Sequence, residues 1–212
     1  MTTNTQATEV INKKSLLTVR PMVQMGMLAA IATILMMFEI PLPFAPSFYK
    51  IDFSEIPVLI GSFALGPVAG VIIEALKVLL HVVFKGSTTM GIGDAANFLV
   101  GISFVLPASL IYRRHKTRKT AVIGMIVGTL FMTAAGCVMN AYVLLPLYAK
   151  MFHMPMDTLI AMGSAVNPAI HGLGGFVMLA VAPFNLLKGA LVSIITFLIY
   201  KKISHLLKAN TL

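Results

Sequence analysis

The chain has 212 residues, of which 58% are hydrophobic and only 11% are charged. Soluble globular domains carry about a quarter charged residues, so this composition excludes an ordinary soluble domain and predicts an integral membrane protein. The formal charge of +9 would suit a nucleic-acid partner. However, the basic residues stand beside apolar segments, as orientation signals in membrane proteins do, so we expect no nucleic-acid partner.

The N-terminal region combines a polar tail with an apolar segment. The first twenty residues lack the apolar core and cleavage site of a signal peptide, so we expect residues 1–20 to form a cytoplasmic tail. A first membrane span is predicted at about residues 21–39. Within it, Gly26, Ala29 and Ala30 form a strip of small side chains that another helix could approach closely. From spacing alone, packing within this chain and contact with a partner protein explain the strip equally well.

The next segment, residues 40–54, is predicted to be a non-helical outer loop. Three prolines within six residues forbid a helix there. The loop also carries four aromatic side chains, at Phe44, Phe48, Tyr49 and Phe53. These rings could anchor the chain at the membrane interface or close over a flat ligand, and the pattern favours neither use.

An apolar stretch at residues 55–84 decides the number of spans. A helix of that length would measure about 45 Å, which is too long for one upright span and short for two. A break at Gly66-Pro67 places the basic cluster at 113–119 on the same side as both chain ends, in agreement with the positive-inside rule. We therefore predict an all-α integral membrane protein with six transmembrane helices at residues 21–202, both termini cytoplasmic and a C-terminal tail at 203–212.

The third predicted span contains two charged residues that are three positions apart. Glu74 and Lys77 can pair across one helical turn. An internal ion pair that holds the bundle together is the favoured explanation for them.

Four polar side chains from three later spans are expected in the outer half of the membrane. Asn97 belongs to the fourth span, Asn140 lies near the outer end of the fifth, and Asn185 and Lys188 share one face of the sixth. A lysine at such a depth costs a few kcal/mol and marks a functional site by default. Amides and an ammonium group suit the polar edge of a small flat molecule, whereas interhelical hydrogen bonds are the structural alternative. We predict that these side chains converge on a small-molecule site.

Catalytic and metal-binding patterns are missing from the sequence. The five histidines are scattered, and neither an HExxH motif, a GxSxG motif nor a P-loop is present. The single Cys137 offers no disulfide or metal motif. We therefore expect no enzyme activity and no bound metal.

With these residues identified, the chain resembles the riboflavin-binding S components of energy-coupling-factor (ECF) vitamin transporters over nearly its whole length. The segments that carry the resemblance are IDFSEIP at 51–57, FALGPVAG at 63–70, ANFLVG at 96–101, NAYVLLPLY at 140–148 and PFNLLKG at 183–189. The resemblance implies a multi-pass protein of a prokaryotic cell membrane that binds riboflavin from outside and has no cofactor of its own. It also implies a transmembrane scaffold subunit and two cytoplasmic ATPase subunits as partners.

The resemblance also assigns roles to individual residues. It places ligand contacts on Asn140, Asn185 and Lys188, and it implies that the small-residue strip at Gly26 and Ala30, with Ala29 beside them, packs on the scaffold subunit. The full set of residues that we expect around the ligand is Asn140, Asn185, Lys188, Lys50, Ile51, Asp52, Asn97 and Phe44.

Two alternatives remain open at this point. A stand-alone secondary transporter of a flavin or similar molecule would use Glu74, Lys77 and Lys188 to couple an ion. An intramembrane enzyme is less favoured, because the catalytic motifs are missing.

Overall fold

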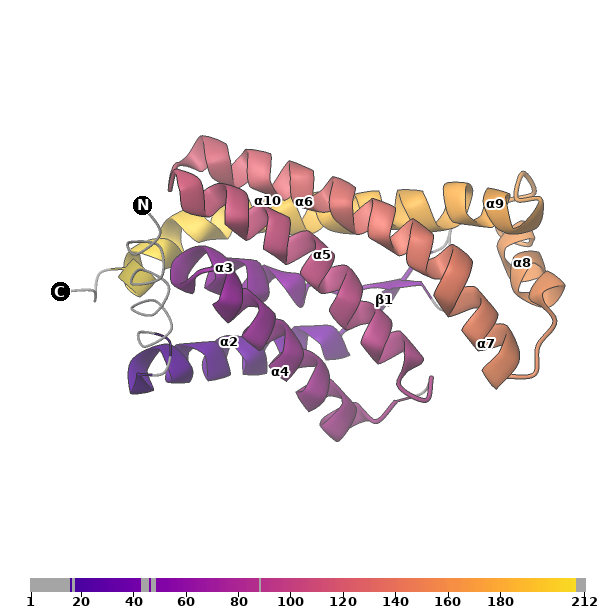
Figure 1. Cartoon of the computed structure of the whole chain (residues 1–212), viewed down its shortest axis with the longest axis horizontal. Coiled ribbons are helices and arrows are strands. Elements are labelled where there is room, and N and C mark those ends of the chain that lie inside the picture. The colour runs from indigo at the N-terminus through magenta and orange to yellow at the C-terminus, as the bar shows by residue number, and fades with distance from the viewer. Residues whose placement is uncertain (1–15, 17, 43–45, 47–48, 88, 209–212) are drawn as a thin grey trace, which may run out of the picture.

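The computed structural model describes residues 16, 18–42, 46, 49–87 and 89–208, with side chains up to residue 199. Most of the predicted N-terminal tail and the end of the C-terminal tail lie outside these residues. The described part is built almost entirely of helices packed side by side along one long axis, which confirms an all-α membrane protein (Figure 1).

The helices differ in whether they are long enough to span a membrane. Within the described residues, five are long and apolar enough to do so: Val19–Met37 (α2), Pro67–Lys85 (α4), Ile92–Arg114 (α5), Arg118–Met151 and Gly172–Ile199. The fourth of these combines α6 (Arg118–Met139), η1 (Asn140–Leu144) and α7 (Leu145–Met151), whereas the fifth combines α9 (Gly172–Phe176), η2 (Val177–Val181) and most of α10 (Ala182–Lys208). A further helix, α8 (Met156–Ser164), connects them outside the bundle axis (Figure 1).

The break predicted at Gly66-Pro67 is confirmed, but it separates two helices of unequal length. The first, α3 (Glu55–Leu65), has 11 residues, and Pro67 begins α4. Gly66 has a φ of 106°, which residues with a side chain rarely adopt, and proline suits the first turn of a helix. Because a membrane-spanning helix needs about 20 residues, α3 could not cross alone.

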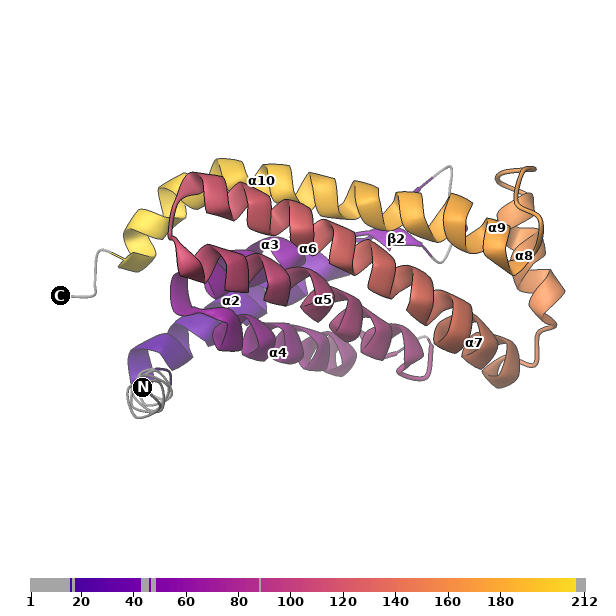
Figure 2. The ribbon, with the colours of Figure 1, turned by 45° about the horizontal axis from the view of Figure 1, so that its top comes forward.

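An extended segment precedes α3 and explains why this helix is short. Two short strands, β1 (Ile40–Pro41) and β2 (Lys50–Ile51), pair antiparallel. From β2 the chain passes into α3, which continues toward the end of the bundle where α10 finishes (Figure 2). The hairpin therefore brings the chain part of the way into the bundle before the helix begins.

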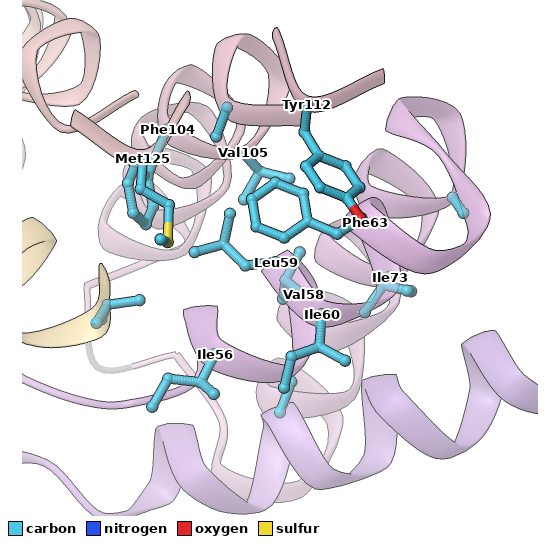
Figure 3. Close-up of a cluster of buried hydrophobic side chains, with 14 of the residues drawn as sticks. Ile56, Val58, Leu59, Ile60, Phe63, Ile73, Phe104, Val105, Tyr112 and Met125 are labelled. Carbon is cyan, nitrogen blue, oxygen red and sulfur yellow. The ribbon is translucent and has the colours of Figure 1, made fainter. Parts of the chain in front are cut away.

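Helix α3 lies at the centre of the hydrophobic core. Val58 and Leu59 have no exposed surface, and the ring of Phe63 packs at a tilt against the ring of Tyr112 of α5, with centroids 4.7 Å apart. Figure 3 shows these side chains between α2, α4 and α5, and Met125 of α6 lies beside Phe104. A helix buried on every side must be apolar all round, which explains the near-continuous hydrophobic sequence of α3.

One end of the bundle carries the α5–α6 connection with its basic residues. The start of α2, the α3–α4 break, the α5–α6 connection and the end of α10 lie together at that end (Figure 1). The opposite end carries the β1–β2 hairpin, the α4–α5 connection and α7 to α9 (Figure 2).

Candidate functional site

Two wide helical turns lie near the end of the bundle that carries the hairpin. These π-helical turns are η1 and η2, and a proline follows each of them two residues later, at Pro146 and Pro183. Proline lacks an N–H and clashes with the carbonyl group four residues earlier, so it disfavours a regular α-helical turn at that point. Single π turns in α-helices are frequent at functional sites. Asn140 is the first residue of η1, and Asn185 comes one turn after η2.

The side chains of the two asparagines meet at Gly136 of α6. Nδ2 of Asn140 donates to the carbonyl oxygen of Gly136 at 2.8 Å. A methyl group on Gly136 would lie 2.8 Å from Nδ2 of Asn185, so the missing side chain makes room for that amide. Nδ2 of Asn185 also donates to Val181 O at 2.9 Å. Both asparagines are buried, at 8% and 4% exposure.

Tyr49 covers the asparagine pair from the hairpin. Its hydroxyl group donates to Oδ1 of Asn140 at 2.7 Å. Its ring lies against Phe184 and Phe176, with centroids 5.0 and 6.3 Å away. Burial raises the pKa of the Tyr49 phenol far above its ordinary value, so the hydroxyl group stays protonated and acts as the donor.

Lys188 forms an ion pair with a residue that follows the hairpin. Its Nζ lies 2.9 Å from Oδ2 of Asp52, which is 4% exposed. Asp52 is held in turn by the backbone N–H of Ser54 at 2.9 Å and by the Ser54 hydroxyl group. The ion pair joins α10 to the segment between β2 and α3, so two distant parts of the chain meet at this point.

Ile51, Lys50 and Phe44 are the remaining loop residues predicted around the ligand. Ile51 is buried at 3% exposure. Lys50 points to Glu39 instead, with Nζ 2.8 Å from Oε2, and Lys85 approaches the same oxygen at 2.9 Å. This carboxylate therefore ties the end of α2, the hairpin and the end of α4 together. Phe44 lies outside the described residues.

We expect Glu39→Gln to loosen the hairpin. Burial raises the pKa of Glu39, but hydrogen bonds and charge attraction from Lys50 and Lys85 outweigh burial and keep the pKa below its usual value. The two ion pairs of Glu39, with Lys50 and Lys85, are therefore complete at neutral pH and are lost as the pH falls through that lowered pKa. Because exposed ion pairs are worth about 0.2–1 kcal/mol, Glu39→Gln should speed amide hydrogen exchange at residues 49–51 by up to roughly fivefold.

An exposed carboxylate elsewhere provides the matched control for this change. Asp157→Asn also converts one acidic side chain to an amide, on α8, and should leave exchange at residues 49–51 unchanged. Equal exchange in wild type and Glu39→Gln would show that the two lysines do not restrain the hairpin.

The side-chain oxygen of Asn97 does not hydrogen-bond to Asn140, Asn185 or Lys188. Its Oδ1 is buried and has no hydrogen-bond partner among the described residues. It lies on the stripe of α5 that includes Asp94 and Gly101, which face His81 and Glu74 of α4. The role of Asn97 in a site stays a prediction.

The small-residue strip of α2 is divided between two faces. Gly26 and Ala30 are exposed, whereas Ala29 has no exposed surface and packs in the core of this chain. Only Gly26 and Ala30 of the three are thus open to a partner.

An apolar groove between α6 and α10 lies apart from the polar cluster. It has a volume of about 670 Å³ and is lined by residues such as Met125, Ile126 and Phe197. Asn140, Asn185 and Lys188 do not line it. Tyr49 contacts Asn140 and Asp52 contacts Lys188, and the hollow predicted between the three side chains stays a prediction.

The sequence did not predict three of the contacts around these polar side chains. Gly136 makes room for Asn185, and Phe176 lies against Tyr49. Oε1 of Glu55 accepts a hydrogen bond from Nζ of Lys77 at 2.8 Å. The signals were weak: glycine is common in membrane helices, and no spacing rule connects residues 22 positions apart. The predicted Glu74–Lys77 pair is confirmed, with 2.7 Å between Oε1 and Nζ.

Comparisons with known proteins point to one family. Residues 20–200 match a family model described as "ECF transporter, substrate-specific component". The riboflavin transporter RibU of Staphylococcus aureus is 35% identical over 88% of this chain and 92% of its own length. The riboflavin transporter FmnP of Bacillus subtilis is 32% identical over 87% and 92%. A solved structure of the S component of a bacterial ECF transporter superposes with a TM-score of 0.69 at 34% identity, over 89% of this chain and 98% of that one.

Proposed function

This chain belongs to the substrate-specific components of ECF transporters, and on that premise we propose that it captures riboflavin from outside the cell for ATP-driven uptake by partner subunits. It is a membrane transport protein and not an enzyme, and riboflavin is its transported ligand. One observation supports the proposal at individual residues: the buried Asn140 and Asn185 meet at Gly136, and the buried Lys188 follows Asn185 by three positions on α10.

The proposed topology has six crossings, with both termini in the cytoplasm of a bacterial cell. The crossings are the five long helices plus the extended segment with α3. This count is supported by the basic cluster at 113–119, because it places these charges with the chain ends, on the side that the positive-inside rule calls cytoplasmic.

In the proposed complex, the flat flavin ring occupies the space that the Tyr49 ring fills here. Phe176 and Phe184 supply aromatic surfaces for it. Riboflavin presents an edge with one N–H donor between two carbonyl acceptors. Oδ1 of Asn140 can accept from that N–H, while Asn185 and Lys188 can donate to the carbonyls.

Hairpin residues complete the proposed site. Asp52 pairs with Lys188, Ile51 precedes it in β2, and Lys50 holds the hairpin to Glu39. Asn97 and Phe44 are proposed to contribute at the margin. Because outer loops carry no arginine to clamp a phosphate, the uncharged vitamin is favoured over its phosphate ester.

Riboflavin binding by the purified chain tests the function directly. Titration into detergent-solubilised protein should quench flavin fluorescence with one ligand per chain, because buried rings and polar groups surround the flavin. Flavin mononucleotide should bind more weakly. Lack of quenching by properly folded protein would exclude the proposed function.

Tyr49→Phe tests whether the chain occupies its own site. The change removes the hydroxyl group that holds Asn140 but keeps the ring. Since a typical hydrogen bond is worth about 0.5–1.5 kcal/mol, riboflavin should bind roughly two- to tenfold more tightly to this variant. Tyr148→Phe, a phenol removed from α7, should leave affinity unchanged. Weaker binding by Tyr49→Phe would show that the hydroxyl group contacts the ligand instead of competing with it.

The proposed partners are a transmembrane scaffold subunit and two cytoplasmic ATPases. A chain that only captures its ligand needs an external energy source, and the sequence holds no P-loop. The exposed Gly26 and Ala30 of α2 are the proposed contact with the scaffold, since small residues let helices approach closely in a membrane. The ion-coupled alternative is not favoured, because the matching relatives are ECF components.

Ala30→Leu should separate binding from transport. A larger side chain on an exposed position leaves the riboflavin site untouched, so affinity should stay within twofold of wild type. Uptake into cells that express the whole transporter should fall roughly tenfold, which corresponds to about 1.4 kcal/mol of lost packing. Val138→Leu enlarges an exposed apolar residue on α6 and should have no effect. Normal uptake by Ala30→Leu would place the scaffold elsewhere.

A further inference from the structure

Five ionisable side chains are buried together where α3, α4 and α10 meet. Each is less than a tenth exposed, and the members are Asp52, Glu55, Glu74, Lys77 and Lys188. If every group were ionised, three carboxylates would face two ammonium groups. One negative charge would then lack a counterpart inside the membrane, where an unpaired charge is very costly.

The three carboxylates differ in how well the protein stabilises a negative charge. Asp52 accepts hydrogen bonds from Lys188 and from the N–H and hydroxyl groups of Ser54. Glu55 accepts one from Lys77 at 2.8 Å. Oε1 of Glu74 lies 2.7 Å from Nζ of Lys77, but within the described residues neither oxygen of Glu74 forms a well-aligned hydrogen bond. Glu74 is thus the least stabilised of the three as an anion.

Glu55 and Glu74 lie side by side against α5. A methyl group on Gly101 would overlap Oε1 of Glu74 and would lie only 3.0 Å from Oε1 of Glu55. Two neighbouring carboxylates away from water resist ionising together. Glu55 is in the first turn of α3, where the helix dipole favours a negative charge, whereas Glu74 lies within α4.

We infer that Glu74 binds a proton at neutral pH and forms a buried neutral carboxylic acid. The cluster then resolves into two complete ion pairs, Asp52 with Lys188 and Glu55 with Lys77, and one uncharged acid. The proton also supplies a donor beside Glu55, whose Oε2 lacks a hydrogen-bond partner in the described part of the chain. A metal cation does not fit this position, because the Lys77 ammonium group already lies between the two glutamates.

Charged side chains surround Glu74 from several neighbouring elements. Glu55 comes from α3, Lys77 from α4 itself, and Asp52 and Lys188 from the hairpin side and α10. Further along α4, His81 pairs with Asp94 of α5 at 3.3 Å. This inference does not depend on the identity of the transported molecule.

Infrared spectroscopy of the ligand-free, full-length protein tests the inference. A protonated carboxyl group has a C=O stretch that a carboxylate lacks, and a detergent without ester groups leaves this region clear. At neutral pH we expect one such band in wild type, its loss in Glu74→Gln, and its retention in the exposed-site control Asp157→Asn. Glu55→Gln should also remove the band, because Glu74 then takes over the charge of Lys77.

Thermal unfolding provides the second readout. Glutamine has the shape of the protonated acid, so Glu74→Gln should keep the wild-type midpoint at neutral pH. Raising the pH should lower the wild-type midpoint, because the folded chain must give up a proton that the unfolded chain has already lost, and Glu74→Gln should lack this decline. A wild-type protein without the band, a band that persists in Glu74→Gln, or failure of that variant to fold would each overturn the inference.

Discussion

Lys188→Met is expected to abolish most riboflavin binding and to destabilise the protein at the same time. The change removes a proposed ligand donor and leaves Asp52 buried at 4% exposure without its cation. Loss of one partner from a buried ion pair costs about 3–5 kcal/mol, and loss of a charged hydrogen bond to the ligand costs about 1.5–3 kcal/mol. Flavin fluorescence quenching and the thermal unfolding midpoint measure the two effects.

The double variant Asp52→Asn, Lys188→Met separates these effects. Removing both charges relieves the burial penalty, so the unfolding midpoint should recover most of its loss. Riboflavin affinity should stay roughly ten- to a hundredfold below wild type, because the donor is still missing. Recovery of full affinity in the double variant would mean that Lys188 acts only as the counter-ion of Asp52 and does not contact riboflavin.

Gly136→Ala is the second change for which we expect a large effect, and it should act on binding alone. The added methyl group would lie 2.8 Å from Nδ2 of Asn185, so the amide must turn away from its present position. Alanine also favours a helix over glycine by about 0.5–1 kcal/mol, which offsets the crowding. We expect riboflavin affinity to fall by roughly 10- to 100-fold, equivalent to about 1.4–2.8 kcal/mol, at a nearly unchanged unfolding midpoint.

Gly174→Ala serves as the matched control. It adds the same methyl group to a helical glycine in α9, where no atom of the described residues lies within 4 Å of the new carbon. Affinity and midpoint should both match wild type. If Gly136→Ala also binds normally, the two asparagines do not form the recognition surface that we propose.

Several features of the fold could be predicted from the sequence because they depend on local chemistry. The break at Gly66-Pro67 follows from a glycine with positive φ and a proline at a helix start. The Glu74–Lys77 pair follows from the geometry of one helical turn. Each of these depends on neighbours within a few positions, which the order of residues specifies.

Other features could not be predicted because they depend on contacts between distant segments. Lys50 pairs with Glu39 at the base of the hairpin, and its predicted place near the ligand stays a prediction. Tyr49 donates a hydrogen bond to Oδ1 of Asn140, which lies 91 residues away in the chain. Periodicity and spacing contain no information about which loop side chain reaches which helix.

The sequence by itself determined that this is an apolar helical membrane protein, where its helices break, and that a lysine and several asparagines are placed at depth, because the cost of burying polar groups acts on each residue separately. Only the tertiary structure decided that α3 enters the bundle from an extended hairpin, that Gly136 gives Asn185 its room, and that Asp52 and Glu55 complete the charges of Lys188 and Lys77. Those choices belong to packing, since close approach and charge neutralisation are settled only when segments far apart in the chain share one volume.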